Sequence, residues 1–181
     1  MKKAFTMLEL VFVIVVIGIL SAIVIPNTRT NPVQEAAIDL VSKIRYTQHL
    51  AMTNDKYAAG AWYKNRWQIV FSGNTYSIVS DSNGTYAKDP QNVNEEIKDI
   101  EIKGLNAFTL TGTECNNQSI LSFDVAGRPL VGSLVGTTTP YTRLGTAGIL
   151  IQTNDCAIKL TDGTETAFID IRPETGYATI R

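Results

Sequence analysis

The residues that could carry out chemistry are few and lie far apart in the sequence. His49 is the only histidine, which excludes most catalytic triads and multi-histidine metal sites. The chain contains no G-x-S-x-G, H-E-x-x-H, phosphate-loop or dinucleotide-binding motif. Four carboxylates lie beside turns or on expected strands: Asp124, Asp155, Asp162 and Asp170. Paired-carboxylate catalysis stays open as an alternative, but solvated turn residues explain them more simply, and we expect no enzyme activity.

A polar segment at residues 81–96 could bind a cation or carry a sugar. Its spacing differs from that of an EF-hand, because Gly84 comes too early and no bidentate Glu follows at the required distance. Calcium is therefore an alternative to a plain surface loop, and we expect no other metal or cofactor. Asn83 lies in a sequence similar to the extended acidic sequon of bacterial N-glycosylation, so a glycan is a second alternative.

The two cysteines point to structure rather than to catalysis. Cys115 and Cys156 lie about 40 residues apart and form no C-x-x-C pair, so metal or thioredoxin-like chemistry has little support. A single structural disulfide fits if the domain lies outside the cytoplasm, and two buried free thiols are the alternative. Closing a loop of this length should stabilise the domain by roughly 4 kcal/mol.

Glu9 is the charged residue whose position most needs an explanation, because residues 10–25 that follow it carry no charge. Residues 5–25 are long enough to cross a bilayer as a helix, for which roughly 20 residues are needed. An ionised carboxylate in such a span costs roughly 2.5–3.5 kcal/mol at the helix centre, and less near its end, unless it is paired. We therefore expect Glu9 to have a partner.

The charges around this apolar segment predict its orientation. Lys2 and Lys3 precede it, so the positive-inside rule places a short amino terminus in the cytoplasm. The sequence thus predicts a single-pass inner-membrane protein with a periplasmic carboxy-terminal domain. Over the whole chain 16 Lys and Arg balance 17 Asp and Glu, which gives no electrostatic footprint for nucleic acid.

Residues 2–26, KKAFTMLELVFVIVVIGILSAIVIP, resemble the class III signal of type IV prepilins and type II secretion pseudopilins. The resemblance implies that a prepilin peptidase cuts between Ala4 and Phe5 and N-methylates Phe5. The family usually has Gly before the cut, where this chain has Ala4. Glu9 then matches the acidic residue five positions into the mature chain, and Pro26 matches the proline near the end of the assembly helix.

The resemblance also supplies a partner for Glu9. When helices stack into a filament, its carboxylate can pair with the charged amine of Phe5 on a neighbouring subunit, which offsets two desolvation costs together. The inner membrane and other pilins or pseudopilins are the partners implied, besides the peptidase. A plain signal anchor, without a role for Glu9 in assembly, is the alternative.

A second helix and a β-rich domain follow. Asn31 and Pro32 are suited to cap and begin the helix, and an apolar stripe then recurs at helical spacing: Val33, Ala36, Ala37, Leu40, Val41, Ile44, Thr47 and Ala51. Residues 67–71 and 76–79, separated by Ser72-Gly73-Asn74, predict a β-hairpin. Further strands are expected at residues 97–102, 119–125, 147–152, 157–160, 167–171 and 177–180.

The resulting expectation is an α+β pilin fold, in which one long amino-terminal helix, half transmembrane and half amphipathic, packs on an antiparallel sheet domain. The divisions are a leader at 1–4, a transmembrane and assembly helix at 5–25, an amphipathic helix at 26–56 and a periplasmic β-rich domain at 57–181. Four segments, at 40–52, 67–71, 123–130 and 169–180, resemble parts of H-type minor pseudopilins and FimT-like minor pilins.

Two functions follow as hypotheses. The first is a minor pilin or pseudopilin that assembles through its amino-terminal helix into a type II secretion pseudopilus or a type IV pilus, at initiation or at the tip. The second is a pilus-associated binding module for DNA or a secreted substrate, with contacts at Arg143, Lys159, Arg172 and Arg181. Without its leader the chain has 14 Lys and Arg against 17 Asp and Glu, which argues against strong phosphate binding, and nucleic acid is not the expected partner.

Overall fold

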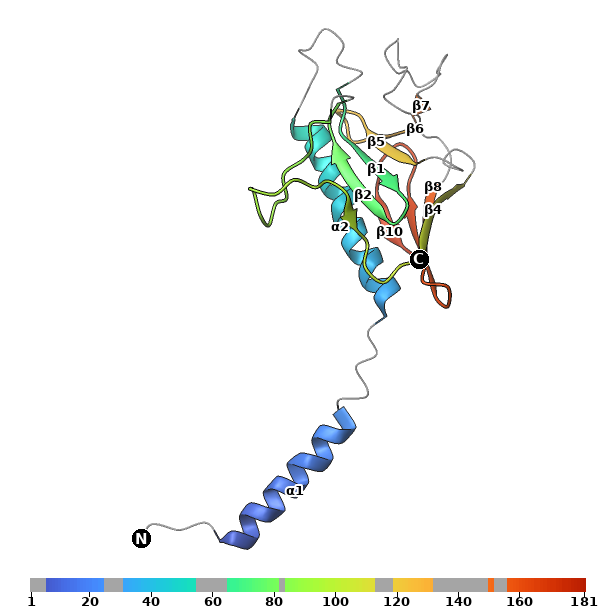
Figure 1. Ribbon diagram of the computed structural model, residues 1–181. Coiled ribbons are helices and arrows are strands. Elements are labelled where there is room, and N and C mark those ends of the chain that lie inside the picture. Colours follow the sequence, from blue (N-terminus) through green and yellow to red (C-terminus); the bar gives the residue numbers. More distant parts are fainter. Residues whose placement is uncertain are drawn as a thin grey trace. The chain divides into compact units, whose positions relative to one another are not determined.

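The computed structural model describes residues 6–24, 31–54, 65–81, 84–112, 119–131, 150–151 and 156–181 (Figure 1). The chain divides into two compact units, Met1–Asn31 and Pro32–Arg181, and each is described here by itself. Several residues singled out by the sequence lie outside the described ranges: Ala4, Phe5, Pro26, Asn83, Cys115, Arg143 and Asp155. Cys156 is buried and disulfide-bonded, and its predicted pairing with Cys115 stays a prediction.

Helix α1, Met7–Val24, begins at a threonine cap. The hydroxyl of Thr6 accepts a hydrogen bond from the Glu9 amide at 3.3 Å, and the Thr6 carbonyl accepts from the amides of Glu9 and Leu10. Thr6 and Glu9 thus have the spacing of a capping box, and Glu9 lies in the first turn, where the helix dipole favours a negative charge.

The prediction of a single pass through the inner membrane is wrong: among the described residues, no helix is long and apolar enough to cross a membrane. The 18 residues of α1 rise by about 27 Å, whereas the hydrocarbon core of a bilayer is about 30 Å thick. Glu9 further shortens the uncharged part of the helix, because it lies in the first turn.

Helix α2, Pro32–Thr53, has the apolar stripe that the sequence predicts. Its eight predicted inward residues are all buried, from Val33 near its start to Ala51 near its end. Pro32 occupies the first helical position, where it loses no hydrogen bond, and it disfavours helical geometry at the preceding Asn31.

The described residues contain ten strands, which form two antiparallel sheets. The larger sheet has the order β3-β2-β1-β5-β6-β7 and contains β1 Gln68–Ser72, β2 Thr75–Val79, β3 Ile100–Glu101, β5 Ile120–Phe123, β6 Pro129–Val131 and β7 Leu150–Ile151. The smaller sheet has the order β10-β9-β8-β4 and contains β4 Ala107–Gly112, β8 Cys156–Thr161, β9 Thr166–Ile171 and β10 Ala178–Ile180. The predicted hairpin is confirmed as β1–β2, in which Ile69 lies opposite Ile78.

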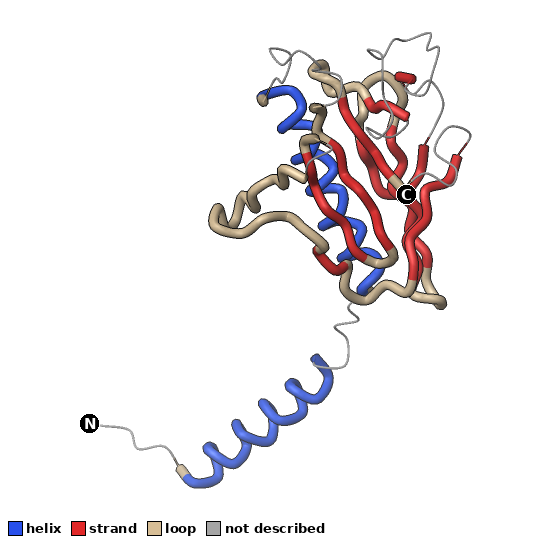
Figure 2. Tube along the Cα trace, turned by 45° about the horizontal axis from the view of Figure 1, so that its top comes forward, coloured by secondary structure: helices blue, strands red, loops and turns tan. Residues whose placement is uncertain are grey.

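The predicted fold, one long helix on one sheet, is therefore wrong. The described residues contain two separate shorter helices, and the strands divide between two sheets. Helix α2 contacts β10 and β9 of the smaller sheet as well as β5 and β1 of the larger sheet, and Figure 2 shows it alongside the strands. The apolar stripe of α2 is broad enough to pack against both sheets, because a helix in a globular domain buries an arc of more than about 100°.

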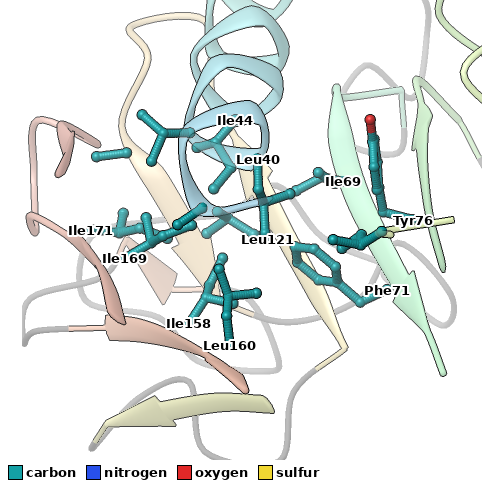
Figure 3. Packing of buried hydrophobic residues seen from close by; sticks show 14 of the residues in the cluster. Leu40, Ile44, Ile69, Phe71, Tyr76, Leu121, Ile158, Leu160, Ile169 and Ile171 are labelled. Atoms are coloured by element: carbon teal, nitrogen blue, oxygen red, sulfur yellow. The ribbon is translucent and has the colours of Figure 1, made fainter. Parts of the chain in front are cut away.

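The core lies where this helix meets the two sheets (Figure 3). Leu40 and Ile44 of α2, Ile69 of β1, and Ile158 and Ile169 of the smaller sheet are all at most 1% exposed. Burying a large aliphatic side chain contributes about 1.5–3 kcal/mol, so the shared cluster supplies most of the favourable free energy of folding.

Gln48 joins two turns to the same face of α2. Its side-chain amide donates to the carbonyls of Gly127 and Thr175, both at 2.8 Å. Gly176 lies so close that a Cβ atom there would come within 2.6 Å of the Gly127 carbonyl and 2.8 Å of the Gln48 amide. The β5–β6 turn and the β9–β10 turn therefore meet with no room for a side chain at Gly176.

Substituting Gly176→Ala should destabilise the domain more than Gly73→Ala. Both glycines have a positive φ, 67° and 60°, so both changes carry the cost of a left-handed residue, about 1–2 kcal/mol. Only at Gly176 must backbone also move, which should cost a further 1–3 kcal/mol or so. Urea unfolding of the two variants measures the difference, and equal losses would contradict the close approach.

Candidate interaction surfaces

Three of the carboxylates considered for catalysis, Asp124, Asp162 and Asp170, have structural partners, whereas Asp155 lies outside the described residues. The buried carboxylate of Asp124 accepts hydrogen bonds from the amides of Ala126 and Arg128 at 2.9 and 2.8 Å, and from the Arg128 side chain at 2.6 Å. Asp162 accepts from the amides of Thr164 and Glu165 in the β8–β9 turn, and these bonds lower its pKa. Across the described residues, no group of three or more His, Cys, Asp or Glu could hold a metal ion.

Two of the candidate DNA contacts come together on the smaller sheet. Lys159 on β8 lies opposite Phe168 on β9, and the guanidinium of Arg181 lies 4.9 Å from the centre of the Phe168 ring. Arg172 follows β9 at the far end of the same strand, where its amide bonds to the Tyr177 carbonyl at 3.0 Å. Phe168 is half-buried, and cations beside an aromatic ring are a common arrangement in nucleic-acid-binding surfaces.

The charge of Arg181, however, is already compensated. Its Nε and Nη2 atoms donate to the two carboxylate oxygens of Asp170 at 2.8 and 3.3 Å. This bidentate pair raises the pKa of the Arg181 guanidinium, and a phosphate would have to displace Asp170 to use the same donors. The arrangement gives little support to DNA binding as the main function.

A loop between β2 and β3, described at residues 80–81 and 84–99, projects from the domain and is anchored on α2 at residues 88 and 89 (Figures 1 and 2). The ammonium of Lys43 lies 3.4 Å from the carboxylate of Asp89, and the hydroxyl of Tyr46 donates to the Lys88 carbonyl at 2.8 Å. Val93 follows Asp89 by four residues and is 70% exposed. An apolar side chain thus stands at the outer part of a fixed loop.

The anchor of this loop has an electrostatic component. The pKa of Asp89 is held below its ordinary value, first by the hydrogen bond from the Gln91 amide and then by Lys43. The pKa of Tyr46 is raised by burial and by the nearby Asp89 carboxylate. Asp89 therefore stabilises the loop in its ionised form.

A groove of about 490 Å³ lies on the other flank of α2, against β10. Ile38, Val41, Ser42 and Arg45 line it from the helix, and Thr179 and Ile180 line it from the strand. The Nη2 atom of Arg45 donates to the Ala178 carbonyl at 2.9 Å, and the guanidinium lies 5.4 Å from the centre of the Tyr177 ring. The groove thus has both aliphatic and polar walls and contains one oriented cation.

The third surface is α1 itself, whose apolar side chains are exposed all round within its own unit. Met7 is 88% exposed, Phe12 is 68% exposed and Ile17 is 57% exposed. A helix that is apolar on every side is normally buried, either in a protein core or among other helices. Covering this helix would therefore remove a large apolar area from water.

No protein-family model, no characterised protein and no solved structure matches the chain. The fold and the surfaces must therefore be interpreted from their own geometry.

Sequence reasoning missed the residues that connect these surfaces. The sequence predicts no structural or binding role for Gln48, Arg45, Asp89 or Val93. Arg45 and Gln48 nevertheless lie in the segment predicted to be helical. For Arg45 and Gln48 the available signal was their spacing from the apolar stripe of α2, which places them at its borders, whereas Asp89 and Val93 lie in a loop and have no such signal.

Asp89→Asn should weaken the domain at neutral pH and lose that effect in acid. Because the pKa of Asp89 is lowered in the folded state, its contribution is present above its ordinary pKa of 3.8 and is lost as the pH falls through the lower folded value. We expect the variant to be less stable by roughly 1 kcal/mol at pH 6 and equal to the native protein near pH 2.

Urea unfolding of the native protein and of the Asp89→Asn variant at the two pH values measures this difference in the free energy of unfolding. Glu95→Gln serves as the control, because the Glu95 side chain makes no ion pair in the part of the chain that the structure describes. A deficit that is the same at both pH values would contradict an electrostatic anchor.

Proposed function

We propose that the protein is a type IV pilin-like minor subunit, which assembles through α1 into a type II secretion pseudopilus or a type IV pilus. The observation that carries the proposal is α1: a helix with large apolar side chains exposed all round and Glu9 in its first turn. Packing against the α1 helices of neighbouring subunits would bury this surface. The resemblance of residues 2–26 to prepilin signals supports the same function.

The burial of apolar surface would favour assembly. Burying apolar area contributes about 25 cal/mol per Å², and each of the exposed Leu, Ile, Val and Phe side chains adds to that gain. The carboxylate of Glu9 must then find a cation among the packed helices, and the amine of a neighbouring Phe5 is the group that leader removal would create. Prepilin peptidase and the other filament subunits are the partners in this proposal.

Glu9→Ala should abolish incorporation into sedimentable filaments while leaving the amount of the protein unchanged. The structure adds a necessary control, because Glu9 also lies at the capping-box position of α1. Glu9→Gln retains a side chain that can cap the helix but removes the charge. Both variants should therefore fail to assemble if the charge pair is required.

The measurement is the fraction of each variant in sheared and sedimented filaments, beside the native chain and Glu35→Ala. Glu35 is an exposed carboxylate in the first turn of α2, so it matches the loss of one charge at a helix start. Normal incorporation of Glu9→Gln with failure of Glu9→Ala would show that Glu9 acts as a cap. Normal incorporation of both would overturn its role in assembly.

A further inference from the structure

We propose that the loop tip around Val93 docks into the α2–β10 groove of a second copy of this chain, with Glu95 pairing with Arg45. This contact deepens the proposed filament function and rests on it for its setting. It assigns a role to two features outside α1: an exposed apolar side chain on an anchored loop, and a groove with aliphatic walls and one oriented cation.

The loop tip can enter a groove on a partner, and its projecting part around Val93 is called the knob below. Val93 is the most exposed large apolar residue in the described part of the domain, at 70%. The turn that presents it is closed by hydrogen bonds from the Glu95 amide to the Asn92 carbonyl at 2.9 Å and from the Asp89 amide to the Glu95 carbonyl at 3.0 Å. Because the turn is already ordered, docking it would cost little conformational entropy.

The groove has room for this knob and apolar side chains that it can contact. Its volume of about 490 Å³ exceeds that of a valine side chain, and Ile38, Val41 and Ile180 supply apolar walls beside the polar Ser42 and Thr179. Ile38 is 57% exposed on its own domain, so a partner would remove apolar area from water on both sides of the contact. Val93 would therefore contact the aliphatic part of a groove whose remaining walls are polar.

The charges beside the knob and in the groove are also complementary. The guanidinium of Arg45 is oriented by the Ala178 carbonyl, yet the described residues give it no carboxylate partner. Glu95 is exposed two residues from Val93 and likewise has no ion pair there, whereas Glu96 is already paired with Lys88 at 3.0 Å. Glu95 is thus the carboxylate beside the knob that is available to Arg45.

The positions of the two surfaces favour an open-ended contact. Lys43 and Tyr46 hold the loop on one flank of α2, and Ile38 and Arg45 face β10 on the other flank. Knob and groove are different patches of one subunit, so each copy can give one contact and receive one. Such a head-to-tail interface produces an open array when its rotation does not close a ring, as a filament requires.

Site-directed cross-linking tests the contact directly. Full-length Val93→Cys and Ile38→Cys chains, with different tags, are mixed in non-ionic detergent, allowed to assemble by detergent removal and oxidised. We expect a disulfide between the two variants, because a bridge requires Cα atoms within about 7 Å. The matched control is Val125→Cys with Ile38→Cys, since Val125 is an exposed valine on another turn, and this pair should not cross-link.

The same samples separate this contact from the filament proposal. Sedimentable filaments without the 93–38 disulfide would overturn the docking and leave the proposed function standing. The disulfide in material that never sediments would support the docking and count against the filament. Equal cross-linking of the Val93 and Val125 variants would overturn the docking.

Charge reversal supplies a second, independent test. Glu95→Lys should weaken association of the full chain roughly fivefold, the usual upper range for an exposed ion pair, and adding Arg45→Glu should restore it. Glu165→Lys, an exposed carboxylate in the β8–β9 turn, is the control and should leave association unchanged. Because Arg45→Glu also loses the bond to Ala178, the decisive comparison is the double variant with Glu95→Lys, and absence of rescue would overturn the pair.

Discussion

The apolar stripe of α2 is the constraint on which the rest of the domain depends. Leu40 and Ile44 lie in one cluster with residues of both sheets, so neither sheet can bury its inner face without the helix. Because this stripe faces the core, the side chains on its borders and on the opposite face of α2 must lie at the surface. Its two borders carry Lys43 and Tyr46 on one flank and Ile38 and Arg45 on the other, and these hold the projecting loop and line the groove. The surface features are thus consequences of the way the core is packed.

Much of this arrangement could be predicted where the signal is local. The eight residues of the stripe and the β1–β2 hairpin follow from periods of 3.6 and 2, and both predictions are confirmed. The division into two sheets could not be predicted, because it depends on pairing between strands that are distant in sequence, such as β4 with β8. The short β6 was missed for the same reason, since three residues beginning with Pro129 have no periodicity of their own. The helix length was overestimated because hydropathy alone does not register that α1 ends at Val24 and that α2 starts anew at Pro32.

The interaction surfaces were harder to predict than the core. A polar residue such as Gln48 gives no sign in the sequence that its amide will join two turns from different parts of the chain. The cations proposed for DNA were easier to find than to interpret, because the charge of Arg181 is balanced by Asp170, eleven residues earlier in the chain but on the adjacent strand. Charge counts predict the average field of a protein, whereas the availability of one guanidinium depends on its neighbours in space.

In the proposed filament, α1 and the loop contact would contribute different things. A helix that is apolar on all sides gains free energy from almost any neighbour, so its burial drives association but does little to select one rotation or one axial offset. Selection requires directional groups, and Glu9 is the only charged side chain that α1 provides. A knob that enters one groove, with one carboxylate facing one guanidinium, would add directional contacts. Affinity from the helix and register from the domain would then be separable, because they arise from apolar area in one unit and from shape and charge in the other.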